Sequence, residues 1–155
     1  MAIQNIFVVG AGLMGSGIAQ NAITSGFDVT LNDKQQAAVE RAQVVIKKAL
    51  AREVSKGRMT QEAMDEALTH LTVDSGMEGA KKADLVIEAI YENLEAKQAV
   101  FTELEDLCPA KTIFASNTSS ISLTALASAT KRPSRVVGMH FFSPVPKMKL
   151  CEVIF

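Results

Sequence analysis

Tryptophan is absent from this chain of 155 residues, and cysteine, tyrosine and proline are scarce. The two cysteines, Cys108 and Cys151, lie far apart and form no C-x-x-C pattern. This spacing excludes a disulfide-rich scaffold and a cysteine metal site. We therefore expect two reduced, partly buried thiols and no bound metal, which is typical of a cytoplasmic protein.

The chain also lacks long apolar runs and any excess of charge of one sign. No run approaches the roughly 20 residues of a membrane-spanning helix. Met1 and Ala2 lead almost at once into apolar residues, so we expect no membrane segment and no signal peptide. The net charge of −1 excludes a strongly basic nucleic-acid surface. With 48% hydrophobic and 21% charged residues, the composition indicates one soluble domain over residues 1–155.

A glycine-rich turn near the start is the most informative feature that is present. The segment Gly10-Ala11-Gly12-Leu13-Met14-Gly15 directly follows the apolar run at residues 6–9. A G-x-G-x-x-G turn between a strand and a helix binds the pyrophosphate of a dinucleotide. Gly10 permits the tight turn, Gly12 lets the phosphates approach the backbone, and Gly15 lets the helix pack closely. The free N–H groups at the helix start attract the anion.

An acidic residue at the right distance strengthens this interpretation. A second apolar segment at residues 29–31 ends near Asp33, eighteen residues after Gly15. A carboxylate there can accept hydrogen bonds from the adenosine ribose, and it favours NAD over NADP because it repels a 2′-phosphate. Lys34 is adjacent, but no arginine follows closely. The alternative is an ordinary strand-to-helix loop with no ligand, since such motifs also recur by chance.

Strand-like and helix-like segments alternate along the chain. This order predicts an α/β fold with a doubly wound, mainly parallel sheet of the Rossmann type in a single domain. The predicted strands cover residues 6–9, 29–31, 71–73, 83–90, 112–116, 135–141 and 150–155. One predicted helix directly follows the glycine-rich turn. Four others cover residues 36–54, 60–70, 94–107 and 122–129.

Polar residues lie at the carboxyl ends of three of these strands, at the edge of a parallel sheet where ligands bind. They are Glu92 with Lys97, the cluster at residues 116–120 that includes Ser119, and His140. Helix capping is an equally good explanation for the serine-rich cluster. A lone histidine is also more often structural than catalytic, and His70, near a predicted helix end, is given no catalytic role.

A carboxylate twelve residues after His140 gives this histidine a possible partner. Two strands joined by a loop of that length can bring Glu152 beside the imidazole. A histidine held by a carboxylate is a general base with a fixed tautomer. Beside a nicotinamide, it would take the hydroxyl proton of a secondary alcohol while the cofactor takes the hydride.

Basic side chains recur on the predicted helix at 36–54 and just after it. A solvated helix face explains them as well as a site for an anionic substrate does. These residues are Arg41, Lys47, Lys48, Arg52, Lys56 and Arg58.

Taken together, the motifs resemble the N-terminal domain of the short-chain 3-hydroxyacyl-CoA dehydrogenase family. The resemblance covers all 155 residues and is carried by GAGLMGSGIAQ, ADLVIEAIYENLEAK, TIFASNTSS, TKRP and VVGMHFFSPVPKMKLCEVI. It implies NAD-dependent interconversion of 3-hydroxyacyl-CoA and 3-oxoacyl-CoA of short chain, such as hydroxybutyryl. It also implies catalysis by His140 with Glu152 and Ser119.

The resemblance further assigns ligand contacts to individual residues. Ser119 would hydrogen-bond the substrate's 3-oxygen, and Lys56 would contact CoA. The positions that would contact NAD are Gly10, Gly12, Leu13, Met14, Gly15, Asp33, Glu92, Lys97, Ser119 and Ser143. Two of the family's polar positions differ, since Ser143 stands where the family often has asparagine and Ala49 where some members have serine.

Members of this family continue into a helical domain that contacts substrate and forms a homodimer. The resemblance therefore implies that the 155 residues bind NAD but turn over little substrate alone. Two other functions stay open: a dinucleotide-binding module without catalysis, and a dehydrogenase of free hydroxy acids.

Overall fold

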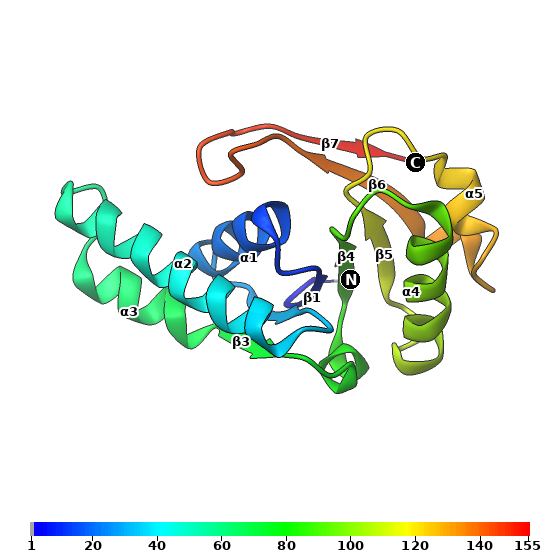
Figure 1. The fold of residues 1–155 in the computed structure, drawn as a ribbon, viewed down its shortest axis with the longest axis horizontal. Coiled ribbons are helices and arrows are strands. Elements are labelled where there is room, and N and C mark those ends of the chain that lie inside the picture. The colour runs from blue at the N-terminus through cyan, green and yellow to red at the C-terminus, as the bar shows by residue number, and fades with distance from the viewer. Residues whose placement is uncertain (1) are drawn as a thin grey trace.

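The protein forms one seven-stranded sheet with helices on both faces (Figure 1). The structure is a computed structural model, and it describes residues 2–155. The strands are β1 (Asn5–Val9), β2 (Asp28–Asn32), β3 (Leu71–Asp74), β4 (Leu85–Glu88), β5 (Ile113–Ser116), β6 (Val136–Phe141) and β7 (Cys151–Ile154). The α-helices are α1 (Leu13–Thr24), α2 (Gln36–Ser55), α3 (Gln61–Thr69), α4 (Leu94–Leu107) and α5 (Leu123–Ala127), and the 3-10 helices are η1 (Glu78–Lys82) and η2 (Pro133–Arg135).

The strand order is β3-β2-β1-β4-β5-β6-β7. The pairs from β3 to β6 are parallel, and β7 alone runs antiparallel to β6. The chain moves outward from β1 through β2 and β3, then returns to the other side of β1 with β4. The carboxyl ends of β1 and β4 therefore form the switch point at which open α/β sheets bind ligands. The predicted α/β, doubly wound fold is confirmed.

Two apolar cores lie on opposite faces of the sheet. On one face, Val8 and Leu31 of the strands pack with buried residues of α1, α2 and α3, including Ile18 and Ile46. On the other face, Phe7 packs with residues of α4, α5 and η1. Figure 1 shows these two groups of helices on either side of the strands. Because both faces are covered, the central strands β1, β4 and β5 are apolar except for one polar residue at an end of each.

Three of the α-helices begin at a capping side chain. Thr60, Asn93 and Ser122 each accept a hydrogen bond from a backbone N–H in the first turn of α3, α4 and α5. These bonds satisfy donors that a helix start leaves free. The predicted capping role of Ser122 is confirmed. His70 is the C-cap residue of α3, and its Nδ1 lies 2.7 Å from Oδ1 of Asp28.

Several boundaries differ from the predicted ones. The strand expected at residues 83–90 is shortened to β4, because Ala83 ends η1 and the chain leaves the sheet after Glu88. There the N–H of Ile90 donates to the Glu88 carboxylate at 2.7 Å rather than to a strand. The helix η1 was not predicted, and the last strand is shorter than residues 150–155.

The cysteines form no disulfide, as predicted. Cys108 is buried, and this burial raises the pKa of its thiol to about 11. Cys151 is half-buried on β7. None of the helices within residues 2–155 combines the length and the apolar character needed to cross a membrane.

Asp84, at the start of β4, ties the amino end of β1 to the sheet. Its carboxylate accepts from the N–H groups of Asn5 at 3.0 Å and Gln4 at 3.1 Å, and Lys111 lies 3.0 Å away. These contacts, the Asn5 bond first, hold the pKa of Asp84 well below its ordinary value. The folded state therefore favours the ionised form.

We expect Asp84→Asn to lower the free energy of unfolding by about 1–3 kcal/mol at pH 7. Because the folded-state pKa is depressed, this contribution is complete above the ordinary carboxyl value of about 3.9 and is lost as the pH falls below it. Urea unfolding at several pH values should show the wild-type advantage shrinking in acid. Asp106→Asn, at an exposed position, should show no such trend.

Candidate active site

The glycine-rich turn adopts the backbone that the sequence predicts. Gly10 has φ +103, and a Cβ there would lie 2.6 Å from the carbonyl oxygen of Ala89. A Cβ on Gly15 would lie 1.7 Å from the carbonyl oxygen of Gly10. Gly15 therefore packs mainly against the turn itself. A Cβ on Gly12 would meet nothing within 4 Å, so the open space lies at the position where the phosphates are expected.

The start of α1 has the features of an anion site. Gly12 is its N-cap, and no side chain caps the first turn. No acidic residue lies in that turn either. Its N–H groups and the positive end of the helix dipole are thus available to a phosphate. Leu13, at the same end, is 77% exposed, and Met14 is half-buried. The residues present fit a pyrophosphate.

Asp33 lies directly after β2 and faces this turn. Its carboxylate accepts from the N–H of Ala11 at 3.0 Å and from that of Gln35 at 3.0 Å. Asp33, Gly10 and Gly12 line one pocket of about 500 Å³, which we call the Asp33 pocket. Asp33 therefore anchors the glycine-rich turn as well as lining the space beside it.

A second pocket, of about 360 Å³, gathers the three polar groups at the carboxyl ends of β4, β5 and β6. We call it the His140 pocket. Met14 also contributes to its wall and connects it to the start of α1. The residues that line it are Met14, Ala89, Ile90, Glu92, Lys97, Asn117, Ser119, His140, Phe141, Phe142 and Ser143.

His140 and Glu152 are brought together by the antiparallel hairpin. The register of β6 with β7 pairs His140 directly with Glu152. Nδ1 of His140 lies 3.1 Å from a carboxylate oxygen of Glu152. The ring of Phe142 lies 4.6 Å from the imidazole, centroid to centroid. With Nδ1 at the carboxylate, Nε2 is the nitrogen that remains for a ligand.

The residues of the polar cluster at 116–120, at the carboxyl end of β5, make different contacts. Asn117 accepts from the N–H of Phe141 at 2.9 Å and so joins this loop to β6. The hydroxyl of Thr118 accepts from the N–H of Ile121 at 2.9 Å, which is a local turn contact. Ser119 is exposed and lines the His140 pocket. Thr118 thus has a structural contact, and the ligand contact of Ser119 stays a prediction.

Lys97 was predicted to contact the cofactor, but its side chain is buried against two carboxylates. It is 1% exposed, and its Nζ lies 2.6 Å from Glu88 and 3.1 Å from Glu92. Burial alone would raise the pKa of Glu92, but hydrogen bonds from Lys97 and Thr118 outweigh it and lower that pKa. The sequence analysis missed Glu88, because it sits inside an apolar run. A carboxylate in a buried strand was the signal that could have identified it.

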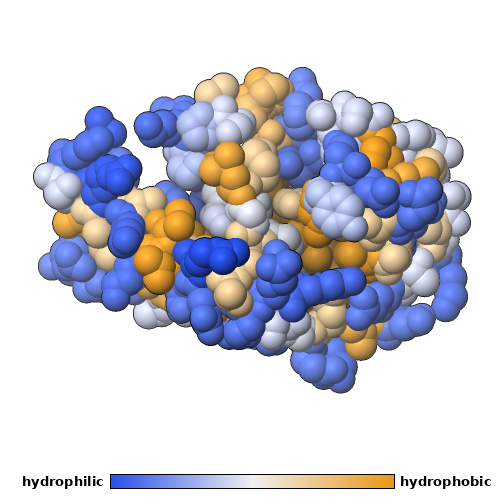
Figure 2. All heavy atoms as spheres, viewed as in Figure 1, coloured by the Kyte–Doolittle hydropathy of each residue, from blue (hydrophilic) through white to orange (hydrophobic). Residues whose placement is uncertain are grey.

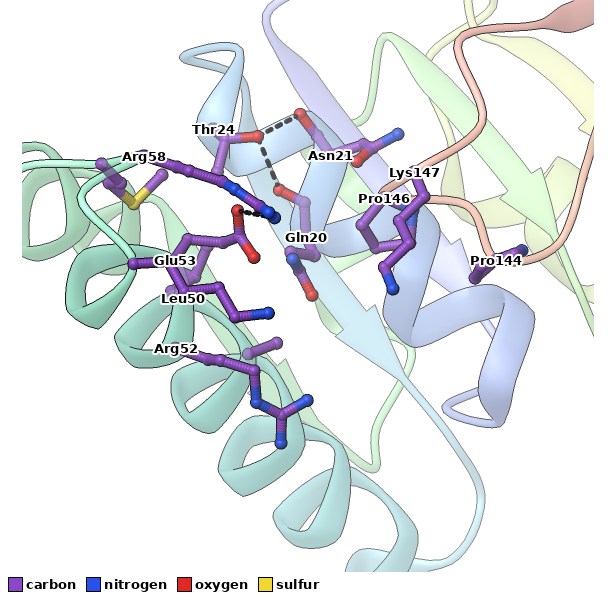
Figure 3. A pocket seen from close by; sticks show the side chains of 13 residues that line it. Gln20, Asn21, Thr24, Leu50, Arg52, Glu53, Arg58, Pro144, Pro146 and Lys147 are labelled. Atoms are coloured by element: carbon purple, nitrogen blue, oxygen red, sulfur yellow. Dashed lines mark hydrogen bonds and ion pairs between the residues drawn. The ribbon is translucent and has the colours of Figure 1, made fainter.

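Lys56 lies outside the His140 pocket. It lines a separate hollow of about 600 Å³, between α1, α2 and the loop that joins β6 to β7. Ala49 lines the same hollow. Figure 3 shows Arg52 and Arg58 on one side and Lys147 on the other, with Arg58 paired to Glu53 at 3.5 Å. Figure 2 shows this part of the surface as an open notch bordered by hydrophilic residues.

A family model described as "3-hydroxyacyl-CoA dehydrogenase, NAD binding domain" matches residues 5–155. A probable 3-hydroxybutyryl-CoA dehydrogenase of Bacillus subtilis is 48% identical over 154 residues, which are 99% of this chain and 54% of that protein. A 3-hydroxybutyryl-CoA dehydrogenase of Clostridioides difficile is 46% identical over 151 residues, 97% of this chain and 54% of that protein. The chain thus spans about half the length of these curated relatives.

Solved structures give the same result. The crystal structure of 3-hydroxybutyryl-CoA dehydrogenase from Escherichia coli K12 superposes with a TM-score of 0.96 at 43% sequence identity. The match covers 99% of this chain and 32% of that one.

Proposed function

Because the chain belongs to the 3-hydroxyacyl-CoA dehydrogenase family, as its NAD binding domain, we propose that it supplies the cofactor site and the catalytic base for the interconversion of 3-hydroxyacyl-CoA and 3-oxoacyl-CoA. The substrate is a short-chain thioester such as 3-hydroxybutyryl-CoA. The observation that carries the proposal is the His140–Glu152 contact of 3.1 Å beside a pocket that adjoins the glycine-rich turn.

In this proposal His140 moves the proton. NAD, when bound, would supply the acceptor for the hydride of C3 of the hydroxyacyl group. Nε2 of His140 takes the proton of the C3 hydroxyl, and the C3–O bond becomes a carbonyl. Glu152 accepts the Nδ1–H of His140, which fixes the tautomer and stabilises the imidazolium that forms. In the reduction direction the same imidazolium returns the proton.

The remaining residues bind and orient. The turn at Gly10, Gly12 and Gly15, together with Leu13 and Met14, holds the pyrophosphate of NAD, and Asp33 accepts from the adenosine ribose. The other predicted NAD contacts line the His140 pocket: Glu92, Lys97, Ser119 and Ser143. Ser119 also donates to the substrate's 3-oxygen.

The basic hollow at Lys56 binds the anionic part of CoA. Lys56 and Arg52 line it, and Lys147 faces them from the β6–β7 loop. Their positive charges suit the phosphates of this ligand.

The proposal includes a second, helical domain. Relatives are about twice as long as this chain, and in the proposed whole protein the added part covers the substrate and forms a cytoplasmic homodimer. The 155 residues themselves then bind NAD with little turnover.

Mixing the chain with NADH and acetoacetyl-CoA tests the proposal. We expect NADH binding, seen as a change in its fluorescence, and slow oxidation. A fusion of this chain to the C-terminal part of the Bacillus subtilis relative should oxidise NADH rapidly. Rapid turnover by the chain alone would contradict the need for a second domain. If the fusion reduces free acetoacetate at the same rate as acetoacetyl-CoA, the result would favour the alternative function, a dehydrogenase of free hydroxy acids.

Asp33→Asn tests the cofactor preference. We expect NAD affinity to fall by roughly tenfold, since a charged acceptor for the ribose hydroxyls is lost. The preference for NAD over NADP should narrow as well, because the repulsion of a 2′-phosphate is removed. Titration calorimetry with both cofactors measures this. Asp106→Asn, on the exposed surface of α4, is the matched control and should change neither affinity. An unchanged preference in Asp33→Asn would contradict the assignment.

A further inference from the structure

A chain of charged side chains lies under one wall of the His140 pocket. Glu88, at the end of β4, is fully buried, and its Oε1 lies 2.6 Å from Nζ of Lys97. Its Oε2 accepts from the hydroxyl of Ser116 at 2.5 Å. Lys97 also lies 3.1 Å from Glu92, whose side chain is 41% exposed. We call Glu88, Lys97 and Glu92 the Glu88 cluster.

The Glu88 cluster has one more carboxylate than it has cations. Within residues 2–155, Lys97 is the one cation that pairs with either Glu88 or Glu92. With all three groups ionised, the cluster carries a net charge of −1. Three donors hold the Glu88 carboxylate in place: Lys97, Ser116 and the N–H of Ile90. The Glu88 carboxylate is therefore fixed in position and removed from water, which strengthens its electrostatic effect, whereas Glu92 at the other end of the cluster is partly exposed.

This charge lies beside the place where the proposed function requires the nicotinamide ring. Lys97 and Glu92 line the His140 pocket, whereas Glu88 lies behind them. The nicotinamide ring of NAD carries a positive charge, and that of NADH is neutral. The pyrophosphate and ribose contacts are common to both forms. A fixed negative charge near the ring therefore changes the difference in binding free energy between NAD and NADH.

We propose that the Glu88 cluster sets the redox preference of the site, favouring the oxidised cofactor over the reduced one. The inference rests on the proposed function, since it needs the nicotinamide in the His140 pocket. Glu88 is a positioning residue here: it holds Lys97, through Lys97 it fixes Glu92, and it supplies the unbalanced charge. A unit charge within about 10 Å of the ring, at an effective dielectric constant of about 20, changes the relative affinity of the two forms by roughly tenfold.

The test compares the dissociation constants of NAD and NADH for the whole chain. Glu88→Gln keeps the shape of the side chain and removes the charge. We expect the ratio of the NAD constant to the NADH constant to rise by roughly tenfold. Glu103→Gln makes the same chemical change on the exposed face of α4, six residues beyond Lys97, and should leave the ratio unchanged. Titration calorimetry measures NAD binding, and cofactor fluorescence measures NADH binding.

The other possible results also decide the interpretation. A purely structural role for Glu88 would weaken both affinities together and leave their ratio as in the wild type, which would overturn the inference. If Glu88→Gln does not fold, Glu92→Gln at the half-exposed end of the cluster must raise the same ratio, and a constant ratio there overturns the inference too. If the wild-type chain binds neither form, the proposed function itself has failed. Binding of both forms with an insensitive ratio leaves that function intact.

Discussion

Replacing His140 with glutamine should lower the turnover number for acetoacetyl-CoA reduction by about 10³-fold, in a fusion that carries the missing half of a relative. Glutamine keeps a polar side chain of similar reach but cannot exchange a proton at neutral pH. In the proposed mechanism, the imidazole lost in His140→Gln takes or returns the hydroxyl proton. The NAD affinity of the 155-residue chain should stay within about threefold of the wild type, since His140 contacts the reacting group rather than the pyrophosphate.

The chain offers a matched control for this variant. His70 is its other histidine, and it also pairs with a carboxylate, Asp28, at 2.7 Å. It lies at the end of α3, however, and lines a pocket with Asn5 at the amino end of β1, away from the cofactor edge. His70→Gln should therefore leave turnover unchanged. Equal losses in both variants would show that the effect is not specific to the proposed base. Full activity in His140→Gln would favour another proton acceptor.

Replacing Lys97 with methionine should lower the free energy of unfolding by about 3–5 kcal/mol. The variant leaves Glu88 fully buried with no cation beside it, and an unpaired buried charge is costly. Guanidinium unfolding at pH 7 measures the loss. Adding Glu88→Gln to the same chain should recover part of it, because the uncompensated charge is then removed.

An exposed lysine gives the comparison. Lys131 pairs with Asp106 at 3.1 Å, but its side chain is 80% exposed. Lys131→Met should cost about 0–1 kcal/mol, as surface ion pairs usually do. If Lys97→Met costs no more than this, the buried pair does not stabilise the end of β4.

Local signals predicted the cofactor end of the molecule. The glycine-rich turn and the acid at Asp33 depend on short spacings, and each appears in the structure at its predicted position. The fold class follows from the alternation of strands and helices. The family and NAD as its cofactor, both implied by the motifs, are confirmed by the match over residues 5–155.

Contacts between distant segments were harder to predict. Glu88 is hidden in an apolar run, and nothing local indicates that Lys97 turns inward to meet it. The hairpin loop that places Lys147 across from Lys56 is equally invisible in the sequence, because α2 and the loop are some ninety residues apart. The His140–Glu152 contact lies between these cases. The length of the loop between the two residues allowed this contact to be predicted, and the antiparallel register of β6 and β7 forms it.

In the proposed mechanism, Glu152 orients His140, and His140 transfers the proton beside the nicotinamide. A crystal structure of the protein with NADH and acetoacetyl-CoA tests it most directly. The result predicted is Nε2 of His140 within hydrogen-bond distance of the 3-oxygen, with the nicotinamide in the His140 pocket. An imidazole turned away from the ligand, or a nicotinamide bound outside this pocket, would contradict it.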